Sequence, residues 1–431
     1  MKTVTFLNQK YQLLENYKDG YESEAVEYLF TEYFLDYDYI IGDWSYGKLR
    51  LKGFCDKQNS KYNEKNEILF KYYYDGLGYN SYDNKYKGLN KEVFHNKIRK
   101  PFTLSYTDIH NYFQCPFKYY CQKILRIDTF TPTLDAMLGS FAHAILENEN
   151  DSFDFEVSSK LRFEDEKNKA LEERLYEFSA KDIFYFNKMK EHIKLVIEEI
   201  KAHKNHTSLN NTLCEKKMDV SLYDGNLIFK GFIDKLWYSS DKSYVAIIDY
   251  KTGKDKESLD NLIYGENLQL PVYIYLLKND SEFKHANLVG FYLQKINIVL
   301  PKKGDGSLEE QIQKNLRLEG YTHPDYVDYI DNNRGEYLKN YKENKDTSVS
   351  KSSKIFNDKD VEDLFELVSK KVDEAYNGIM NANFDITAKR IDGVNISCEY
   401  CPFVDCCYKT DKDIVELKGK KWKEEDENAN E

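Results

Sequence analysis

The sequence predicts an α/β or α+β fold built in two parts. The first 90 residues combine one helical pattern with short strand patterns, and the rest of the chain passes from long helices to strands and back to helices. The chain has 431 residues, enough for two or three domains. Its 37 Tyr and 25 Phe at regular spacing exclude a disordered chain, so we expect a large apolar core.

Composition and charge narrow the possible functions. Apolar runs of a few residues cannot span a bilayer, which needs ~20, and the first residues lack a signal-peptide core, so we expect a cytoplasmic protein with no membrane partner. The net charge of −12 argues against indiscriminate DNA binding. Seven Lys and Arg against two acids in residues 91–126 still allow a local basic face, with an ordinary solvated surface as the equal alternative. No GxxxxGK[ST] loop occurs, so ATP-driven motor activity is not expected of this chain.

Residues 1–90 are predicted to form a small α+β domain. Residues 21–36 show a helical pattern, because the apolar side chains Val26, Leu29, Phe30 and Tyr33 recur at the spacing of a helix. Residues 40–54 predict two short strands about a turn at 44–47, followed by a loop at 56–66. Residues 91–102 are predicted as a basic linker.

A larger domain is predicted over residues 103–423, before an acidic disordered tail at 424–431. Ser105 and Asp108 form a capping box that opens a helix to about Gln122, kinked at Pro116. The next predicted elements are helices at 133–148 and within 158–204, strands at 215–222, 227–238 and 244–251, a helix at 262–277 and a strand at 287–299. A polar, flexible loop at 331–357 then leads to a helix that runs to about Met380 with Asp358 as its N-cap.

The segment LIFKGFIDKLWYSSDKSYVAIIDYKTG carries the strongest chemical signal. A symmetric turn about Asp241–Lys242 would place Asp234 opposite Asp249 on neighbouring strands, with Lys251 on the same face. Two opposed carboxylates repel when buried, and a divalent cation such as Mg²⁺ or Mn²⁺ would compensate them. The Lys251 ammonium could then orient water or stabilise charge at phosphorus. The alternative is a pair of edge-strand acids, one of them paired with Lys251 on a wet surface.

The two strand motifs, GFID at 231–234 and IIDYK at 247–251, resemble those of the PD-(D/E)XK nuclease superfamily. The upstream segments LSYTDIHNYFQCPFKYYCQKIL and LGSFAHAILE and the downstream QLPVYIYLL resemble its RecB and AddB branch. This resemblance implies a restriction-endonuclease-like core, a mixed sheet flanked by helices. It also implies catalytic roles for Asp234, Asp249 and Lys251.

The resemblance extends to residues around that centre. His143 matches the metal-binding histidine of the branch, although a lone histidine on an apolar helix is more often structural. Asp234, Asp249 and the Tyr250 carbonyl would complete the metal ligands. Gln269 and Tyr273 are four residues apart and share a helical face, so they could pack or contact substrate; the family motif places them beside the active site.

The cysteines form a second candidate site. Cys398, Cys401 and Cys407 are closely spaced, and Cys115 is the obvious distant fourth ligand, which indicates zinc or an iron–sulfur cluster. The AddB-like arrangement, one Cys before the core and three after it, favours a [4Fe-4S] cluster that would tie the two ends of the domain together. The adjacent Cys406 is then a spare thiol, while structural positions are expected for Cys55, Cys121 and Cys214.

The N-terminal motifs YQLLENYKDGYESEAVEYLF and YDYIIGDWSYGKLRLKGF resemble the YutD-like family. That resemblance implies no chemistry, and a binding or scaffolding module is the favoured interpretation.

The sequence thus predicts a metal-dependent DNA nuclease, in particular an exonuclease on single strands or DNA ends in repair or recombination, with helicase activity supplied by a partner. The competing interpretation is a non-catalytic DNA-end or partner-binding module that uses the basic 91–126 face.

Overall fold

The structure is a computed structural model that describes residues 2–14, 16, 20–45, 48–63, 85, 90–127, 133–148, 154–174, 176–253, 258–297 and 307–423. The chain divides into two compact units, Met1–Asp83 and Asn84–Glu431. The predicted acidic tail at 424–431 and the end of the predicted loop at 56–66 lie outside the described residues. Within the described part of the chain, no helix has both the length and the apolar character needed to cross a membrane.

The first unit pairs two hairpins with a short helix. Its elements are β1 (Lys2–Phe6), β2 (Gln9–Leu13), α1 (Ser23–Leu29), a 3₁₀ turn (Glu32–Phe34), β3 (Tyr39–Ser45) and β4 (Lys48–Phe54). The predicted hairpin over residues 40–54 is confirmed as β3 and β4, which pair antiparallel. The helix predicted within residues 21–36 is present as α1, but it ends at Leu29 because Phe30 adopts an extended conformation and packs with Phe6 and Phe34 in the core.

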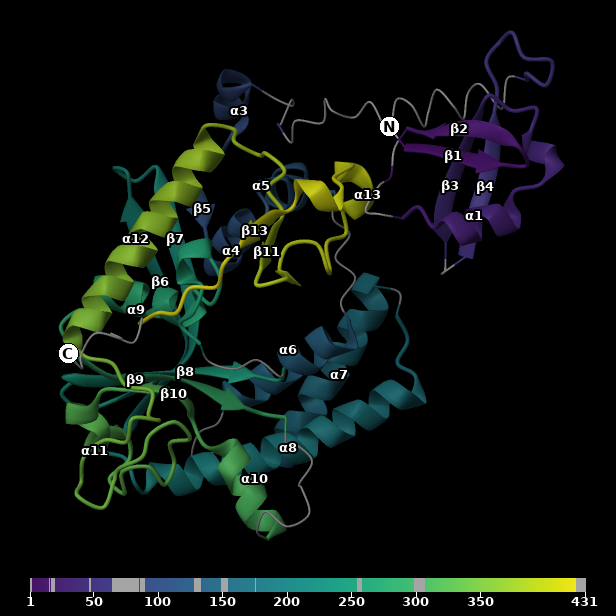
Figure 1. The fold of residues 1–431 in the computed structure, drawn as a ribbon. Coiled ribbons are helices and arrows are strands. Elements are labelled where there is room, and N and C mark those ends of the chain that lie inside the picture. The colour runs from purple at the N-terminus through teal and green to yellow at the C-terminus, as the bar shows by residue number, and fades with distance from the viewer. Residues whose placement is uncertain are drawn as a thin grey trace, which may run out of the picture. The chain divides into compact units, whose positions relative to one another are not determined.

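A six-stranded mixed sheet forms the centre of the second unit (Figure 1). Its strands are β5 (Phe102–Leu104), β6 (Asn211–Leu222), β7 (Leu227–Tyr238), β8 (Tyr244–Lys251), β9 (Asn287–Lys295) and β10 (Glu319–Thr322). Strand β7 runs antiparallel to β6 and β8, β8 runs parallel to β9, and β10 returns antiparallel to β9. The mixed sheet expected from the sequence is confirmed.

Helices cover both faces of this sheet (Figure 1). One apolar core includes residues of α9 (Gln269–Asn279) and α12 (Asp358–Met380), and the other includes residues of α6 (Leu134–Leu146) and α8 (Ala180–Lys204). The remaining α-helices are α3 (Lys91–Lys97), α4 (Tyr106–Gln114), α5 (Pro116–Tyr119), α7 (Phe155–Arg174), α10 (Leu308–Leu316), α11 (Val327–Ile330) and α13 (Val404–Cys407). A small sheet joins β11 (Lys389–Ile391), β12 (Val394–Asn395) and β13 (Val415–Leu417).

Several predicted helix boundaries need correction. The Ser105–Asp108 capping box is confirmed, but α4 ends at Gln114 because Cys115 is extended, and Pro116 starts a new helix that continues into a π-helical turn, Tyr120–Leu125. The helix predicted at 262–277 is a 3₁₀ turn, Leu262–Tyr264, followed by α9. Between them Gly265 has φ +87, and an added Cβ would lie 2.3 Å from the Cβ of Phe113. The N-cap of α12 is Asn357, whose side chain accepts from the Asp360 backbone, and not Asp358.

Residues 91–102, expected as a linker, carry regular structure. They contain α3 and the first residue of β5, and Phe94 of α3 is buried in the core of the second unit. The Asn90 side chain caps α3 by accepting from the Val93 backbone. The basic, Asn-containing composition of residues 91–102 thus gave no sign of α3 or of the buried side chain of Phe94.

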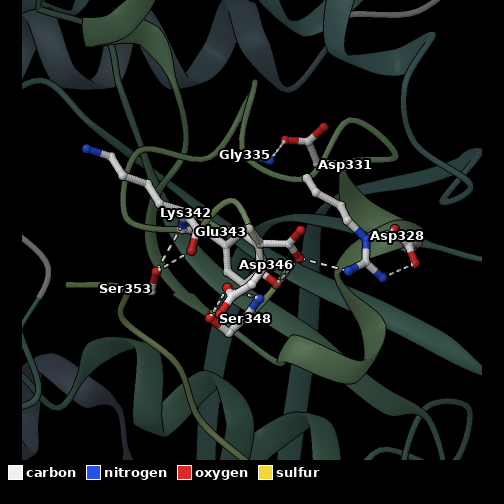
Figure 2. Close-up of polar contacts among 10 residues, drawn as sticks. Asp328, Asp331, Gly335, Lys342, Glu343, Asp346, Ser348 and Ser353 are labelled. Carbon is white, nitrogen blue, oxygen red and sulfur yellow. Dashed lines mark hydrogen bonds and ion pairs between the residues drawn. The ribbon is translucent and has the colours of Figure 1, made fainter. Parts of the chain in front are cut away.

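The segment 331–357 has no regular helix or strand among its described residues, as expected, but it is packed. Asp331 is fully buried and accepts backbone hydrogen bonds from Asn333, Gly335 and Tyr337. Figure 2 shows Asp331 bonded to Gly335, and Lys342 bonded to Ser353 across the loop. Arg334 also bridges Asp328 and Glu343, at 2.6 and 2.8 Å. The prediction that this loop is flexible is wrong because its polar side chains bond to its own backbone.

After β13 the chain returns as a strap to the loop that precedes α9. The Asn261 backbone donates to Lys420 and its side chain accepts from the Lys420 backbone, both at 2.8 Å. The Tyr264 hydroxyl donates to the Lys418 carbonyl at 2.9 Å. Residues 418–422 therefore close the loop that leads into Gln269.

The buried His203 of α8 gives the second unit a pH-dependent stability. Its Nε2 lies 2.7 Å from the Ile330 carbonyl and its ring stacks on Tyr337. Burial lowers the pKa of His203 to about 4, whereas an unfolded histidine titrates near 6.5. Since the unfolded state binds the extra proton between these values, stability is complete above roughly pH 6.5 and falls as the pH drops toward 4.

We expect His203→Gln to remove up to about 3 kcal/mol from the difference in unfolding free energy between pH 7.5 and pH 4.5. Urea unfolding followed by circular dichroism at both pH values measures this difference. The exposed His285 supplies the control, and His285→Gln should keep the wild-type pH dependence. Equal pH dependence in wild type and His203→Gln would contradict the prediction.

Candidate active site

The candidate active site lies on the β7–β8 hairpin. The strand pairs run from Tyr238 opposite Val245 to Lys235 opposite Ile248, in the predicted register. Asp234 and Asp249 are the next residues on the two strands. The turn between the strands is held by Asp241, whose carboxylate accepts hydrogen bonds from the Ser239 and Ser243 side chains. The hydrogen bonds of this turn set the register of the two strands, and the register determines that Asp234 lies across from Asp249.

Asp234 is a buried carboxylate held by the next strand. Its Oδ2 accepts a 2.9 Å hydrogen bond from the Tyr250 backbone and lies 3.5 Å from His143 Nδ1. Burial and the nearby Asp249 charge raise the pKa of Asp234 to about 8. The site therefore holds more negative charge than its own residues neutralise.

Asp249 and Lys251 are connected through α9. Lys251 Nζ lies 2.8 Å from Asp249 Oδ2 and donates to Gln269 Oε1 at 2.7 Å. Gln269 Nε2 donates to Asp249 Oδ1 at 2.8 Å, and the Tyr273 hydroxyl donates to the same oxygen at 3.3 Å. Burial, with the Asp249 charge, raises the pKa of Tyr273 well above its ordinary value, so its hydroxyl keeps the donated proton. Gln269 and Tyr273 thus orient the carboxylate.

His143 reaches this edge from α6. Its Nε2 lies 3.2 Å from the Tyr250 carbonyl oxygen, which brings together two of the predicted ligands. Burial lowers the pKa of His143 and favours the neutral imidazole, the form that binds metals. The sequence motif thus brings the four predicted ligand residues to one place.

Glu215 is a member of the site that sequence reasoning missed. The β6–β7 pairs skip from Cys214 opposite Lys235 to Lys216 opposite Ile233, so Glu215 sits in a bulge with φ +48. One ligand atom from each of His143, Glu215 and Asp234 lies within 4.8 Å of the others. Burial, with the Glu147 and Asp249 charges, raises the pKa of Glu215. The only sequence signal was an acid in the strand beside GFID.

This donor set fits a divalent cation. It combines buried carboxylates, a neutral imidazole and a backbone carbonyl, the oxygen-rich ligands that Mg²⁺ and Mn²⁺ accept. Burial and, after it, the like charge of Asp249 raise the pKa of Asp234, and a bound cation would offset both effects.

The predicted cysteine ligands also come together. Cys115, Cys398, Cys401 and Cys407 line one cavity, together with Lys118 and Lys409. Cys407 is buried, whereas Cys406 is exposed and does not line the cavity. The Ser397 hydroxyl donates to the Gln114 carbonyl at 2.7 Å, which ties the C-terminal segment to α4 beside Cys115. Four cysteines around one cavity are a donor set of the kind that zinc and iron–sulfur centres use, since soft thiolates suit both.

Cys121, Cys55 and Cys214 do not line this cavity. Cys121 is buried in the core, and burial raises the pKa of its thiol to about 11. Cys55 is buried in the first unit, and Cys214 lies on β6. All eight cysteines are free of disulfides.

Comparison with known families agrees with this geometry. Residues 103–408 match the family described as "PD-(D/E)XK nuclease superfamily", and residues 5–82 match "Putative antitoxin YutD-like". The chain therefore belongs to the PD-(D/E)XK nuclease superfamily and carries a YutD-like N-terminal segment.

Individual relatives fall into the same two groups. An ATP-dependent helicase/deoxyribonuclease subunit of Carboxydothermus hydrogenoformans is 26% identical over 348 residues, which is 71% of this chain and 31% of that protein. The protein of the same name from Thermoanaerobacter sp. is 29% identical over 194 residues, 42% of this chain and 17% of that protein. "Putative antitoxin YutD" of Bacillus subtilis is 44% identical over 74 residues, 17% of this chain and 81% of that protein. This chain thus spans less than a third of the two helicase/deoxyribonuclease subunits.

Proposed function

We propose that the chain is a metal-dependent deoxyribonuclease that hydrolyses phosphodiesters in single strands or at DNA ends, as an exonuclease. The observation that carries the proposal is the convergence of Asp234, Asp249 and Lys251 from two adjacent strands, with His143 beside them. Membership of the nuclease superfamily supports the same chemistry.

Each residue has a role that its contacts support. His143, Asp234, Asp249 and the Tyr250 carbonyl would hold Mg²⁺ or Mn²⁺. When bound, such a cation supplies water activation and charge neutralisation for hydrolysis. The Lys251 ammonium, held by Gln269, stabilises negative charge that develops on the phosphate as water attacks in line.

The neighbouring groups act by orientation. Gln269 and Tyr273 fix Asp249 by donating to one of its oxygens, and the Tyr250 backbone fixes Asp234. Since no nucleophilic side chain is needed, the water attacks the phosphodiester directly and no covalent enzyme intermediate forms.

The cysteine cavity is assigned to a [4Fe-4S] cluster held by Cys115, Cys398, Cys401 and Cys407. The AddB-like arrangement of one cysteine before the nuclease core and three after it supports the cluster over zinc. Its role would be to tie α4 to the segment after α12, which the Ser397–Gln114 hydrogen bond already brings together.

The names of the relatives support a proposed cellular role. Two of them are named helicase/deoxyribonuclease subunits, so we assign this chain to cytoplasmic DNA repair or recombination, with a separate helicase as partner. The YutD-like segment is assigned a binding or scaffolding role.

A metal-dependence assay tests the activity. We expect the purified protein to degrade a fluorescent single-stranded oligonucleotide in Mg²⁺ or Mn²⁺ and to leave it intact in EDTA, because the buried acids need a cation to act. Gel analysis of 5′- and 3′-labelled strands reports the rate and the direction of digestion. An intact oligonucleotide under both metals would reject the enzymatic assignment and leave the binding-module alternative.

A further inference from the structure

Beside the active site, a second group of charges lies at the same edge of the sheet. Strand β9 runs parallel to β8, and its last residue, Lys295, pairs with Lys251. Glu319 begins β10 and pairs with Leu293, two residues before Lys295. Paired residues in a sheet share a face, and so do residues two apart on one strand. Lys251, Lys295 and Glu319 therefore point from one face on three successive strands.

Two lysines converge on the one carboxylate. Lys295 Nζ and Lys339 Nζ lie 2.9 and 2.6 Å from the same Glu319 oxygen. The Glu319 side chain is 6% exposed, while that of Lys339 is 38% exposed. Burial alone would raise the pKa of Glu319, but the hydrogen bonds from Lys339 and Lys295 lower it below its ordinary value. The carboxylate is therefore ionised, and the group keeps a net charge of about +1 next to Lys251.

Lys339 is held in place by the packed loop. The Lys339 backbone donates to the Leu318 carbonyl, and the Leu318 backbone donates to the Tyr337 carbonyl, each at 2.9 Å. Asp331 in turn accepts from the Tyr337 backbone at 2.9 Å. Figure 2 shows Asp331 within the loop's hydrogen-bonded network. A lysine on such a fixed backbone loses little freedom when it binds an anion.

We infer that Lys295 and Lys339 bind the sugar–phosphate backbone of the nucleic acid on one side of the scissile bond. Neighbouring strands lie about 5 Å apart, so Lys295 is one strand spacing from Lys251. Lys339 Nζ meets the same Glu319 oxygen as Lys295 Nζ, which brings the two ammonium groups together within reach of adjacent phosphates. Glu319 holds both lysines at this edge and limits their net charge. This inference rests on the proposed function because it uses the Lys251 edge as the point of cleavage.

The test is binding without cleavage. Fluorescence anisotropy of labelled oligothymidylate in EDTA, over a salt series, gives the affinity and the number of phosphate contacts. We expect Lys339→Met and Lys295→Met each to weaken binding about 3–10-fold and to reduce the slope of log K against log salt by about 0.7. Lys295→Arg should keep both values near wild type.

The chain offers a matched control at the opposite end of the same hairpin. There Lys216 and Lys242 converge on Glu282 as Lys295 and Lys339 converge on Glu319. Lys242 lies in the turn before β8, roughly 20 Å or more along the strand from Lys251. Lys242→Met should leave both affinity and salt slope unchanged.

Glu319→Gln separates binding from structural support. If the lysines meet phosphate, loss of the carboxylate charge should tighten binding and steepen the salt slope, even if the thermal unfolding midpoint falls. If they only support the fold, Glu319→Gln should weaken binding together with the lysine variants, and that result would overturn the inference. Unchanged binding in both Lys→Met variants would also overturn the inference. Cleavage of the oligonucleotide by the wild type in Mg²⁺ tests the proposed nuclease function separately.

Discussion

Asp249→Asn should lower the rate of oligonucleotide hydrolysis by about 10³-fold or more while the protein stays folded. Asparagine keeps the size of the side chain and can still bond to Gln269. It removes the anionic oxygens that would bind the cation and the partner that lies 2.8 Å from Lys251 Nζ. The loss should therefore appear in kcat at saturating metal.

The measurement is the initial rate of digestion in Mg²⁺ and Mn²⁺, with circular dichroism to verify folding. Asp219→Asn is the matched control, since Asp219 is an exposed aspartate of the same sheet, on strand β6. It should cleave at the wild-type rate. Equal rates for Asp249→Asn and wild type would place the hydrolysis elsewhere.

Cys407→Ser should abolish loading of the cysteine site, whereas Cys406→Ser should preserve it. Cys407 is buried and lines the cavity shared by Cys115, Cys398 and Cys401, while the adjacent Cys406 is exposed. A structural metal contributes folding energy on the order of 10 kcal/mol, so the loss of one ligand should also lower the thermal unfolding midpoint by many degrees.

Iron and sulfide content, visible absorbance and thermal unfolding of anaerobically purified protein measure these effects. We expect the wild type and Cys406→Ser to be brown and Cys407→Ser to be colourless. A colourless wild type that carries zinc would reject the iron–sulfur assignment. Loss of metal in Cys406→Ser alone would exchange the roles of the two thiols.

The sequence was most informative where local chemistry determines geometry. The Ser, Asp and Lys residues of the β7–β8 turn set its position, and the period of two then determined that Asp234, Asp249 and Lys251 would meet. The Ser105–Asp108 capping box was readable for the same reason, since both partners lie within one helical turn.

Other features depend on tertiary packing and left little local signal. The bulge that turns Glu215 toward His143 and Asp234 exists only in the pairing of β6 with β7. Phe94 makes α3 part of the core, although its neighbours read as a linker. The loop at 331–357 is polar in composition, yet the buried Asp331 carboxylate accepts hydrogen bonds from the backbone of Gly335 and Tyr337. In each case the decisive contacts are made with segments that local patterns do not specify.

The strap at residues 418–422 has a practical consequence for anyone who trims this chain. The stretch that matches the nuclease superfamily stops at residue 408, before β13 and before the backbone of Lys420 reaches Asn261. A fragment cut there would release the segment just ahead of Gln269, the residue that touches both Asp249 and Lys251. The smallest useful fragment of the second unit therefore ends near residue 423, some fifteen residues later than sequence similarity alone would suggest.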